Sequence, residues 1–322
     1  MKESIIPRSK RIEYIDIAKG LGIILVVIGH CLKGGTFPAT WIWSFHMPLF
    51  FILSGLCFAE NKYPTFQSFL TKRIKTLLLP CIYFSILIAL LYVPIKGLST
   101  FYSLFTDGLP GALWFILVLF FCELIYYLIN KYSANTPINI STLFICLIIG
   151  IILNRYSIKL SHSMCSVFTA TFYYGLGHIM KNKINILLSM KCKVIFSAIL
   201  LAIPCAFVLI TKQSINLADN YIPSPEAIYV LVSIIGATGL LLLAMVKNNN
   251  KIWGGGWILF LGKNTLIILS LHMFFIGVAS EYIKPLIQNK LIYKLSEQIF
   301  VWTLLYFSII LINKKVKWIL GK

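Results

Sequence analysis

Residues 11–30 read RIEYIDIAKGLGIILVVIGH, and this stretch decides how the rest of the chain is interpreted. It is apolar over the length of a membrane-spanning helix, yet it carries Asp16, Lys19 and His30. Lys19 and His30 are separated by about three helical turns, so both side chains project from nearly the same face, ~16 Å apart along the axis. Because ionisable residues inside a membrane helix indicate a functional site by default, we expect this helix to carry one.

The composition is that of a membrane protein. Of the 322 residues, 59% are hydrophobic and 12% are charged, and the mean hydropathy is +0.87. The net charge of +19 could indicate nucleic-acid binding, but basic residues scattered over short segments between apolar stretches are better explained by membrane topology. We therefore predict a single transmembrane domain over 1–322, with no separate soluble domain and no nucleic-acid partner.

The apolar stretches predict an all-α integral membrane protein, a bundle of about ten transmembrane helices. The predicted spans are 15–33, 41–59, 77–95, 112–130, 140–154, 164–180, 194–211, 227–246, 256–280 and 298–313. With the N-terminus inside, 21 of the 29 Lys and Arg residues fall in cytoplasmic segments. This excess predicts that both termini are cytoplasmic.

Five of the eight cysteines lie inside apolar stretches, and no CxxC pair occurs. These residues are Cys57, Cys81, Cys122, Cys146 and Cys205. We predict that they are buried as small hydrophobic residues, and we expect neither disulfides nor a metal site.

The second predicted helix contributes a second histidine. It opens with FHMPLFFILSG, residues 45–55, and places His46 at its outer end, within reach of His30. His46 could contact the substrate or anchor the helix at the membrane interface, and the sequence favours neither role. Ser54 and Gly55 are small enough to let another helix approach closely. His272, in the outer half of the ninth helix, is a further candidate for the acceptor side.

Two basic residues suggest an anion-binding site, and one acidic residue suggests a buried carboxylate that pairs with another side chain. Arg73 and Lys75 precede the third helix; positive-inside anchoring explains them, but with Lys19 they would also form a cytoplasmic site for phosphate. Glu123 lies well inside the fourth helix, where a carboxylate requires a partner, and it could orient His30 or bond to a neighbouring helix. Trp114 lies toward the outer interface, where aromatic residues are expected in any case.

Other chemistry has little support in the sequence. There is no Gly-rich P-loop, no HExxH motif and no nucleophile elbow. We also find no pair of interrupted hydrophobic segments of the kind that marks a transporter.

The chain resembles the membrane-bound acyltransferase-3 family, in particular its fucose 4-O-acetylase-like branch. The resemblance rests on five motifs: DIAKGLGIILVVIGH (16–30), FHMPLFFILSG (45–55), KRIK (72–75), LWFI (113–116) and LGKNTLIILSLH (261–272). A basic residue, often arginine, followed by ten residues and a histidine is typical of the family. Here Lys19 and His30 occupy those two positions.

The resemblance implies a multi-pass protein of the bacterial cytoplasmic (inner) membrane that transfers an acetyl group from cytoplasmic acetyl-CoA to a glycan hydroxyl on the far side. It implies that His30 is the catalytic histidine and that Lys19 and Arg73 are the family's basic positions. We expect acetyl-CoA phosphates at Lys19, Arg73 and Lys75, and the acceptor, a cell-surface glycan or its lipid-linked precursor, near His46, Trp114 and His272. Glu123 would orient His30, which would act as general base.

Two other functions remain open from the sequence. A transporter or flippase for a lipid-linked sugar or small anion could use the same basic entrance and polar interior. The same fold could instead transfer succinyl, which depends on the volume around His30.

Overall fold

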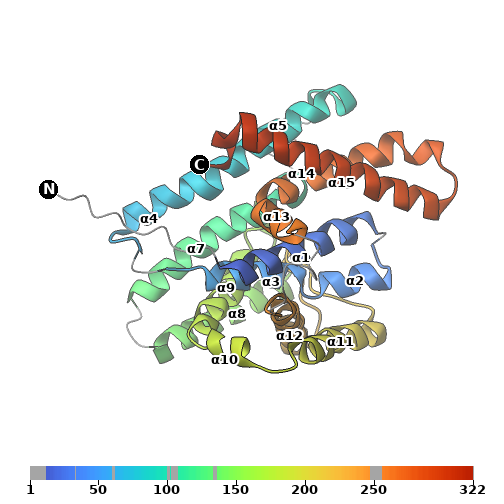
Figure 1. Cartoon of the computed structure of the whole chain (residues 1–322). Helices are drawn as coiled ribbons and strands as arrows, with labels where there is room; N and C mark the ends of the chain where they lie inside the picture. The colour runs from blue at the N-terminus through green and yellow to red at the C-terminus, as the bar shows by residue number, and fades with distance from the viewer. Residues whose placement is uncertain are drawn as a thin grey trace.

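The computed structural model describes residues 12–32, 34–59, 62–99, 102, 108–132, 136–246 and 256–321. The described residues form helices and no strand; an isolated β-bridge joins Asn216 and Tyr221. The chain is therefore an all-α protein, as predicted (Figure 1). The basic segment 1–11, on which the prediction for the N-terminus partly depends, lies outside the described residues.

The described residues contain α-helices together with short 3-10 and π-helical turns. In chain order they are α1 (Glu13–Cys31), α2 (Phe37–Trp43), α3 (His46–Leu56), α4 (Phe66–Arg73), η2 (Ile74–Leu78), α5 (Leu79–Lys96), η3 (Gly111–Leu113), α7 (Trp114–Tyr132), α8 (Thr136–Arg155), η4 (Ser161–Ser163), α9 (Ser166–Lys181), α10 (Ile184–Ser189), α11 (Lys193–Thr211), α12 (Glu226–Ala244), α13 (Trp257–Lys263), α14 (Thr265–Tyr282), η5 (Lys284–Leu286), α15 (Lys290–Lys315) and η6 (Lys317–Leu320).

Eight helical segments of the described residues are long and apolar enough to cross a membrane. They are Glu13–Cys31, Phe37–Leu56, Phe66–Ile95, Gly111–Tyr132, Lys193–Thr211, Glu226–Ala244, Thr265–Leu286 and Lys290–Lys315. The predicted spans 140–154 and 164–180 correspond to α8 and α9, which are not among these eight: α9 has 16 residues, and the part of α8 that the structure describes in full is the shorter apolar helix Asn139–Arg155. The multi-pass character is confirmed, whereas the count of about ten helices stays a prediction.

Two of the predicted spans are broken, contrary to the expectation from sequence. The span 41–59 divides into α2 and α3 at Ser44 and Phe45, and the span 256–280 divides into α13 and α14 at Asn264. Neither break contains a glycine or proline that would signal it in the sequence. Each break exposes a helix end inside the bundle, where its free N–H groups are available to other partners.

The first helix lies at the centre of the bundle (Figure 1). It contacts α2, α3, α12, α13, α14 and α15. The contact with α13 is closest at Gly262, where a Cβ atom would overlap the backbone carbonyl of Asp16. Because α1 is held on several sides, the positions of Lys19 and His30 are fixed relative to the surrounding helices.

Small residues join α3 to α9 in the same way. A Cβ atom on Gly55 would overlap the carbonyl oxygen of Tyr174, and one on Gly177 would overlap that of Ile52. The prediction of a closely approaching helix is confirmed at Gly55, and the neighbour is α9.

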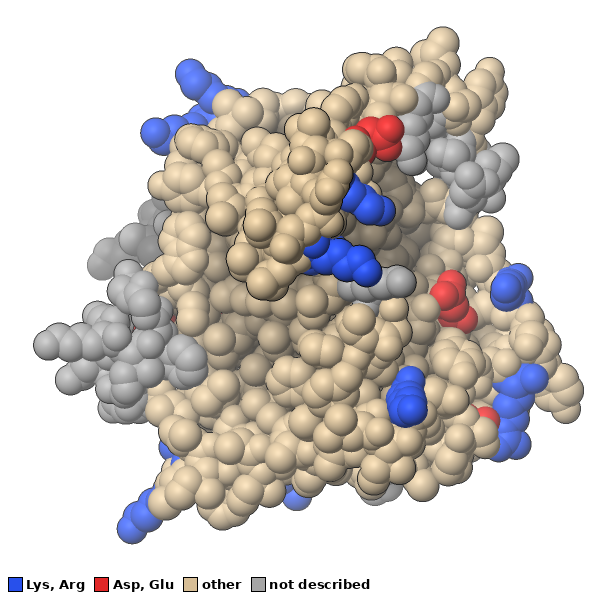
Figure 2. Space-filling view, turned by 90° about the vertical axis from the view of Figure 1, so that its right-hand side faces the viewer, with Lys and Arg blue, Asp and Glu red and all other residues tan. Residues whose placement is uncertain are grey.

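The last helix runs antiparallel to α1. The Lys294 ammonium donates a hydrogen bond to the carbonyl of Cys31, at the end of α1. The Asn313 amide, near the other end of α15, bonds to Asn264 at 2.8 Å. We call the two ends of the bundle the Lys19 side and the His30 side. Figure 2 shows the His30 side, on which charged side chains are scattered and not clustered.

Candidate functional site

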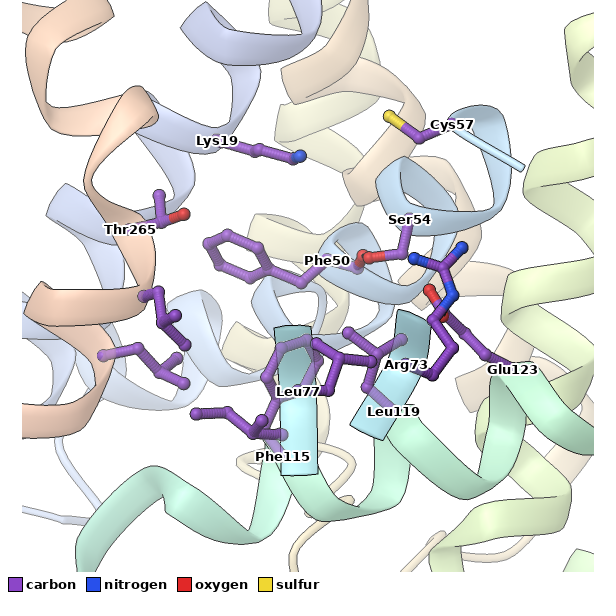
Figure 3. A pocket seen from close by; sticks show the side chains of 13 residues that line it. Lys19, Phe50, Ser54, Cys57, Arg73, Leu77, Phe115, Leu119, Glu123 and Thr265 are labelled. Carbon is purple, nitrogen blue, oxygen red and sulfur yellow. Dashed lines mark hydrogen bonds and ion pairs between the residues drawn. The ribbon is translucent and has the colours of Figure 1, made fainter. Parts of the chain in front are cut away.

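A pocket of about 290 Å³ opens among α1, α3, η2, α7 and α14. Lys19, Arg73 and Glu123 line it together with apolar side chains, as Figure 3 shows. We call this cavity the Lys19 pocket. It brings together two of the basic residues predicted to form an anion site, although they are far apart in the sequence.

The Arg73 guanidinium is held from three directions. Its Nε lies 2.5 Å from a carboxylate oxygen of Glu123, and its Cζ lies 4.8 Å from the centre of the Phe69 ring and 5.7 Å from that of Tyr63. The cation–π contacts and the buried carboxylate both favour the charged guanidinium, and together they hold it in one orientation. Glu123 therefore has Arg73, at the end of α4, as its ionic partner, which agrees with the second of the two alternatives from the sequence, a bond to a neighbouring helix.

The backbone around Arg73 explains how it reaches the pocket. Thr65 and Ser68 form a capping box that starts α4, and the π-helical η2 follows directly after Arg73. A π-helical turn is frequent at functional sites because it shifts the phase of the side chains. Here Arg73, directly before the turn, and Leu77, within it, both line the pocket.

The break between α13 and α14 contributes a helix N-terminus to the pocket. Thr265 and Leu266, the first residues of α14, are among the lining residues. The N-terminus of a helix carries free N–H groups and a partial positive charge, which favour an anion. Lys19, Arg73 and this N-terminus thus outweigh the single negative charge of Glu123.

Two further residues differ from the expectations. Lys75 lies in η2 but is exposed and is not among the residues that line the Lys19 pocket. Cys57, predicted to be buried, is exposed and lines the pocket at the end of α3. Cys81, Cys122 and Cys146 are buried as predicted, and Cys205 is half-buried.

Three histidines meet on the His30 side of this pocket. The rings of His30 and His272 are 5.2 Å apart, and His46 interacts electrostatically with both. His46 and His272 are buried, whereas His30 is partly exposed. The structure therefore brings together all three histidines that the sequence singled out.

Hydrogen bonds to backbone carbonyls define the tautomer of two of these histidines. Nδ1 of His46 lies 3.0 Å from the carbonyl oxygen of Ile42, and Nδ1 of His272 lies 2.9 Å from that of Ile268. A carbonyl oxygen only accepts, so each Nδ1 carries the hydrogen, and in the neutral imidazole the lone pair is then on Nε2. The Nε2 of His272 is buried without a hydrogen-bond partner among the described residues.

Trp43 is a neighbour of His30 that the sequence did not single out. Its ring lies 6.3 Å from that of His30, and its indole nitrogen lies against Gly29. The indole N–H is a donor only, so it adds a hydrogen-bond donor beside the imidazoles. Trp43 ends α2 at the break before α3, a position that no pattern in the sequence marks.

The walls of the Lys19 pocket lead toward the histidines. Phe50 and Leu269 line the pocket, and each is about one helical turn from a histidine on its own helix, His46 on α3 and His272 on α14. Lys19 is joined to His30 through α1. A ligand bound at the basic end of the pocket would therefore have its other end directed toward the three imidazoles.

Trp114 lines a different cavity, of about 340 Å³, which we call the outer pocket. Lys159, Ser161, His162 and Asp219 contribute polar side chains to it. Gly111, also in its wall, packs against Met273, the residue after His272. The outer pocket thus approaches the histidines from a direction other than that of the Lys19 pocket.

Glu297 is a buried carboxylate that the sequence analysis did not single out. Glu297 is 1% exposed; it accepts a hydrogen bond from Tyr293 at 2.6 Å and pairs with Lys294 at 2.8 Å. Lys294 also bonds to the carbonyl of Cys31, next to His30. The predicted span began at residue 298, whereas α15 begins at Lys290, so Glu297 lies inside the helix.

Comparison with known proteins agrees with this geometry. The acyltransferase domain of the acyltransferase-3 family matches residues 12–313. The nodulation protein NolL of Mesorhizobium japonicum (strain LMG 29417 / CECT 9101 / MAFF 303099) is 31% identical over 134 residues, which cover 37% of this chain and 36% of that protein. No solved structure matches. Since the family match covers nearly the whole chain, the chain belongs to the acyltransferase-3 family of membrane acyltransferases.

Proposed function

We propose that the protein is a membrane O-acetyltransferase that moves an acetyl group from acetyl-CoA, bound on the Lys19 side, to a sugar hydroxyl on the His30 side. One observation carries the proposal: α1 places Lys19 in a basic pocket and His30 in a cluster of histidines toward which that pocket leads. The excess of basic residues in the predicted cytoplasmic segments supports a cytoplasmic donor side and the inner membrane as location.

The donor site would hold the phosphates of CoA at the entrance of the Lys19 pocket. Lys19, Arg73 and the N-terminus of α14 supply positive charge there, and Arg73 has N–H groups beyond the one directed at Glu123 for a phosphate oxygen. Ligand pockets typically measure roughly 300–1,000 Å³. A cavity of about 290 Å³ suits the pantetheine arm and acetyl group, with the adenosine outside it.

In the transfer step, His30 removes the proton from the sugar hydroxyl as its oxygen attacks the thioester carbonyl carbon. The tetrahedral intermediate carries a negative oxygen, to which the Trp43 indole N–H beside His30 would donate a hydrogen bond. The carbon–sulfur bond then breaks, and the thiolate takes the proton from His30. The products are an acetyl ester and CoA. His46 and His272 accept hydrogen bonds through Nε2 and orient the reacting groups.

The acceptor would enter through the outer pocket. Trp114 offers an aromatic face for a sugar ring, and Lys159, Ser161 and Asp219 offer polar partners for its hydroxyls. We propose a cell-surface glycan or its lipid-linked precursor as acceptor, in keeping with the family to which the chain belongs.

The test uses membranes that contain the protein, [¹⁴C]acetyl-CoA and the glycan of the producing cell. His30→Ala should lower acetyl transfer by roughly 10²–10⁴-fold, the usual contribution of a positioned base, with unchanged affinity for acetyl-CoA. His178→Ala is the matched control, because His178 pairs with Tyr126 at 2.7 Å away from the cluster. Undiminished transfer by His30→Ala would remove the catalytic assignment.

Release of CoA separates this function from its rivals. An acetyltransferase converts acetyl-CoA to CoA in proportion to the ester formed, whereas a flippase for a lipid-linked sugar or a carrier of small anions does not. Succinyl-CoA offered beside acetyl-CoA measures the preference for the acyl group directly.

A further inference from the structure

A second basic cavity lies on the Lys19 side and is lined by residues of α13, the end of α15 and η6. Its volume is about 460 Å³, and we call it the lysine groove. Lys263, Lys314 and Lys317 line it, and no lining residue is acidic. Three positive charges around one groove, without a carboxylate, are complementary to an anion.

An amide pair fixes the floor of the lysine groove. The Asn313 side chain donates to the side-chain oxygen of Asn264 at 2.8 Å and to the Ile309 carbonyl at 2.9 Å. The Asn264 amide in turn donates to the Phe260 carbonyl at 2.8 Å. These bonds hold the α13–α14 break against α15, so Lys263 and Lys314 extend from elements whose separation is fixed.

The lysine groove borders a surface suited to lipid. Trp257 stacks on Phe260, with ring centres 5.4 Å apart, and lies 5.7 Å from Tyr306. Trp257 and Trp318 are 46% and 58% exposed. Exposed tryptophan and tyrosine beside lysine are typical of the membrane–water interface.

Apolar side chains continue from the lysine groove along α15. Phe307 and Leu311 are 61% and 59% exposed, and Ile309 and Ile310 line the groove itself. An occupant with a charged head and apolar tails would match both surfaces. A soluble phosphate compound would match only the lysines.

We propose that the lysine groove binds the phosphate headgroup of an anionic phospholipid, whose acyl chains lie along the exposed side of α15. Basic pockets between membrane helices bind such headgroups elsewhere. Asn264, whose bonds form the floor, directly precedes Thr265 of the Lys19 pocket. A bound lipid would therefore stabilise the break that shapes that pocket.

The test measures lipid retention by native mass spectrometry of the purified full-length protein. Phosphatidylglycerol should bind and phosphatidylcholine should not. The triple variant K263Q/K314Q/K317Q should bind phosphatidylglycerol roughly 10- to 100-fold more weakly. A control variant, K72Q/K75Q/K183Q, has the same change in charge at exposed lysines outside the lysine groove and should bind like wild type.

Two further experiments distinguish a specific lipid-binding site from general attraction to surface charge. The triple K263R/K314R/K317R keeps the charge and should restore binding, which also shows that loss in the Gln variant is not unfolding. Added CoA or inorganic phosphate should leave the lipid bound. Equal loss in both Gln variants, equal binding of phosphatidylcholine, or displacement by CoA would each overturn the proposal.

Discussion

Arg73 combines a buried ion pair with aromatic contacts at the entrance of the Lys19 pocket. Replacing it by alanine removes a charge-assisted contact to phosphate, which is typically worth about 1.5–3 kcal/mol. We expect Arg73→Ala to raise the Kd of acetyl-CoA about 10- to 100-fold, measured by isothermal titration calorimetry. Lys75→Ala is the matched control, because Lys75 lies two residues away but outside the pocket. An equal effect of both variants would indicate general surface electrostatics and contradict a site at Arg73.

The Trp43 indole provides a second prediction at the scale of one residue. Trp43→Phe keeps an aromatic ring beside His30 but removes the N–H donor. If this donor stabilises the tetrahedral intermediate, kcat should fall about 10²-fold with little change in KM. Steady-state kinetics of acetyl transfer measures both constants. A rise in KM at constant kcat would instead indicate that Trp43 binds the acceptor.

At the scale of the element, the π-helical η2 sets the direction of Arg73. Deleting Thr76 would allow this turn to become α-helical with one residue fewer. The flanking residues would keep their phase, because four α-helical residues turn by about as much as five π-helical ones, but the wide turn that brings Arg73 and Leu77 to the pocket would be lost. We expect this deletion to weaken acetyl-CoA binding as much as Arg73→Ala does, while the protein still elutes as a folded species. Thr76→Ala keeps the chain length and serves as the control. Unchanged donor affinity in the deletion would show that η2 has no part in the site.

The elements also show why prediction from the sequence succeeded in some places and failed in others. Lys19 and His30 share one face because helical periodicity alone fixes their relation, and the sequence contains that information. The Arg73–Glu123 pair joins two helices, so it depends on tertiary packing, which helical periodicity does not predict. Glu297 was missed because hydropathy marks the apolar part of a helix, whereas α15 begins eight residues before the predicted span. The breaks at Ser44 and Asn264 lack the glycine or proline on which recognition of a break depends.

At the scale of the whole molecule, the exposed cysteines test the predicted topology. Cys57 and Cys192 are the exposed cysteines, and both belong to the side predicted to be cytoplasmic. A membrane-impermeant maleimide should therefore label neither in intact cells and both in inverted vesicles, as measured by mass spectrometry of the peptides. Labelling in intact cells would reverse the orientation.

The same two cysteines report on the donor site. Saturating acetyl-CoA should slow alkylation of Cys57, which lines the Lys19 pocket, by at least tenfold, whereas Cys192 should react at an unchanged rate. Protection of both would indicate a change of the whole molecule, and protection of neither would place the donor elsewhere.

The partial exposure of His30 has a consequence for the fate of the donor. A base that removes a proton from a sugar hydroxyl also removes one from water, and a half-open imidazole does not keep water out. Under the proposed function, an enzyme without acceptor would slowly hydrolyse acetyl-CoA to acetate and CoA. The amount of acetyl-CoA lost by hydrolysis would then depend on how fully the glycan fills the space around His30.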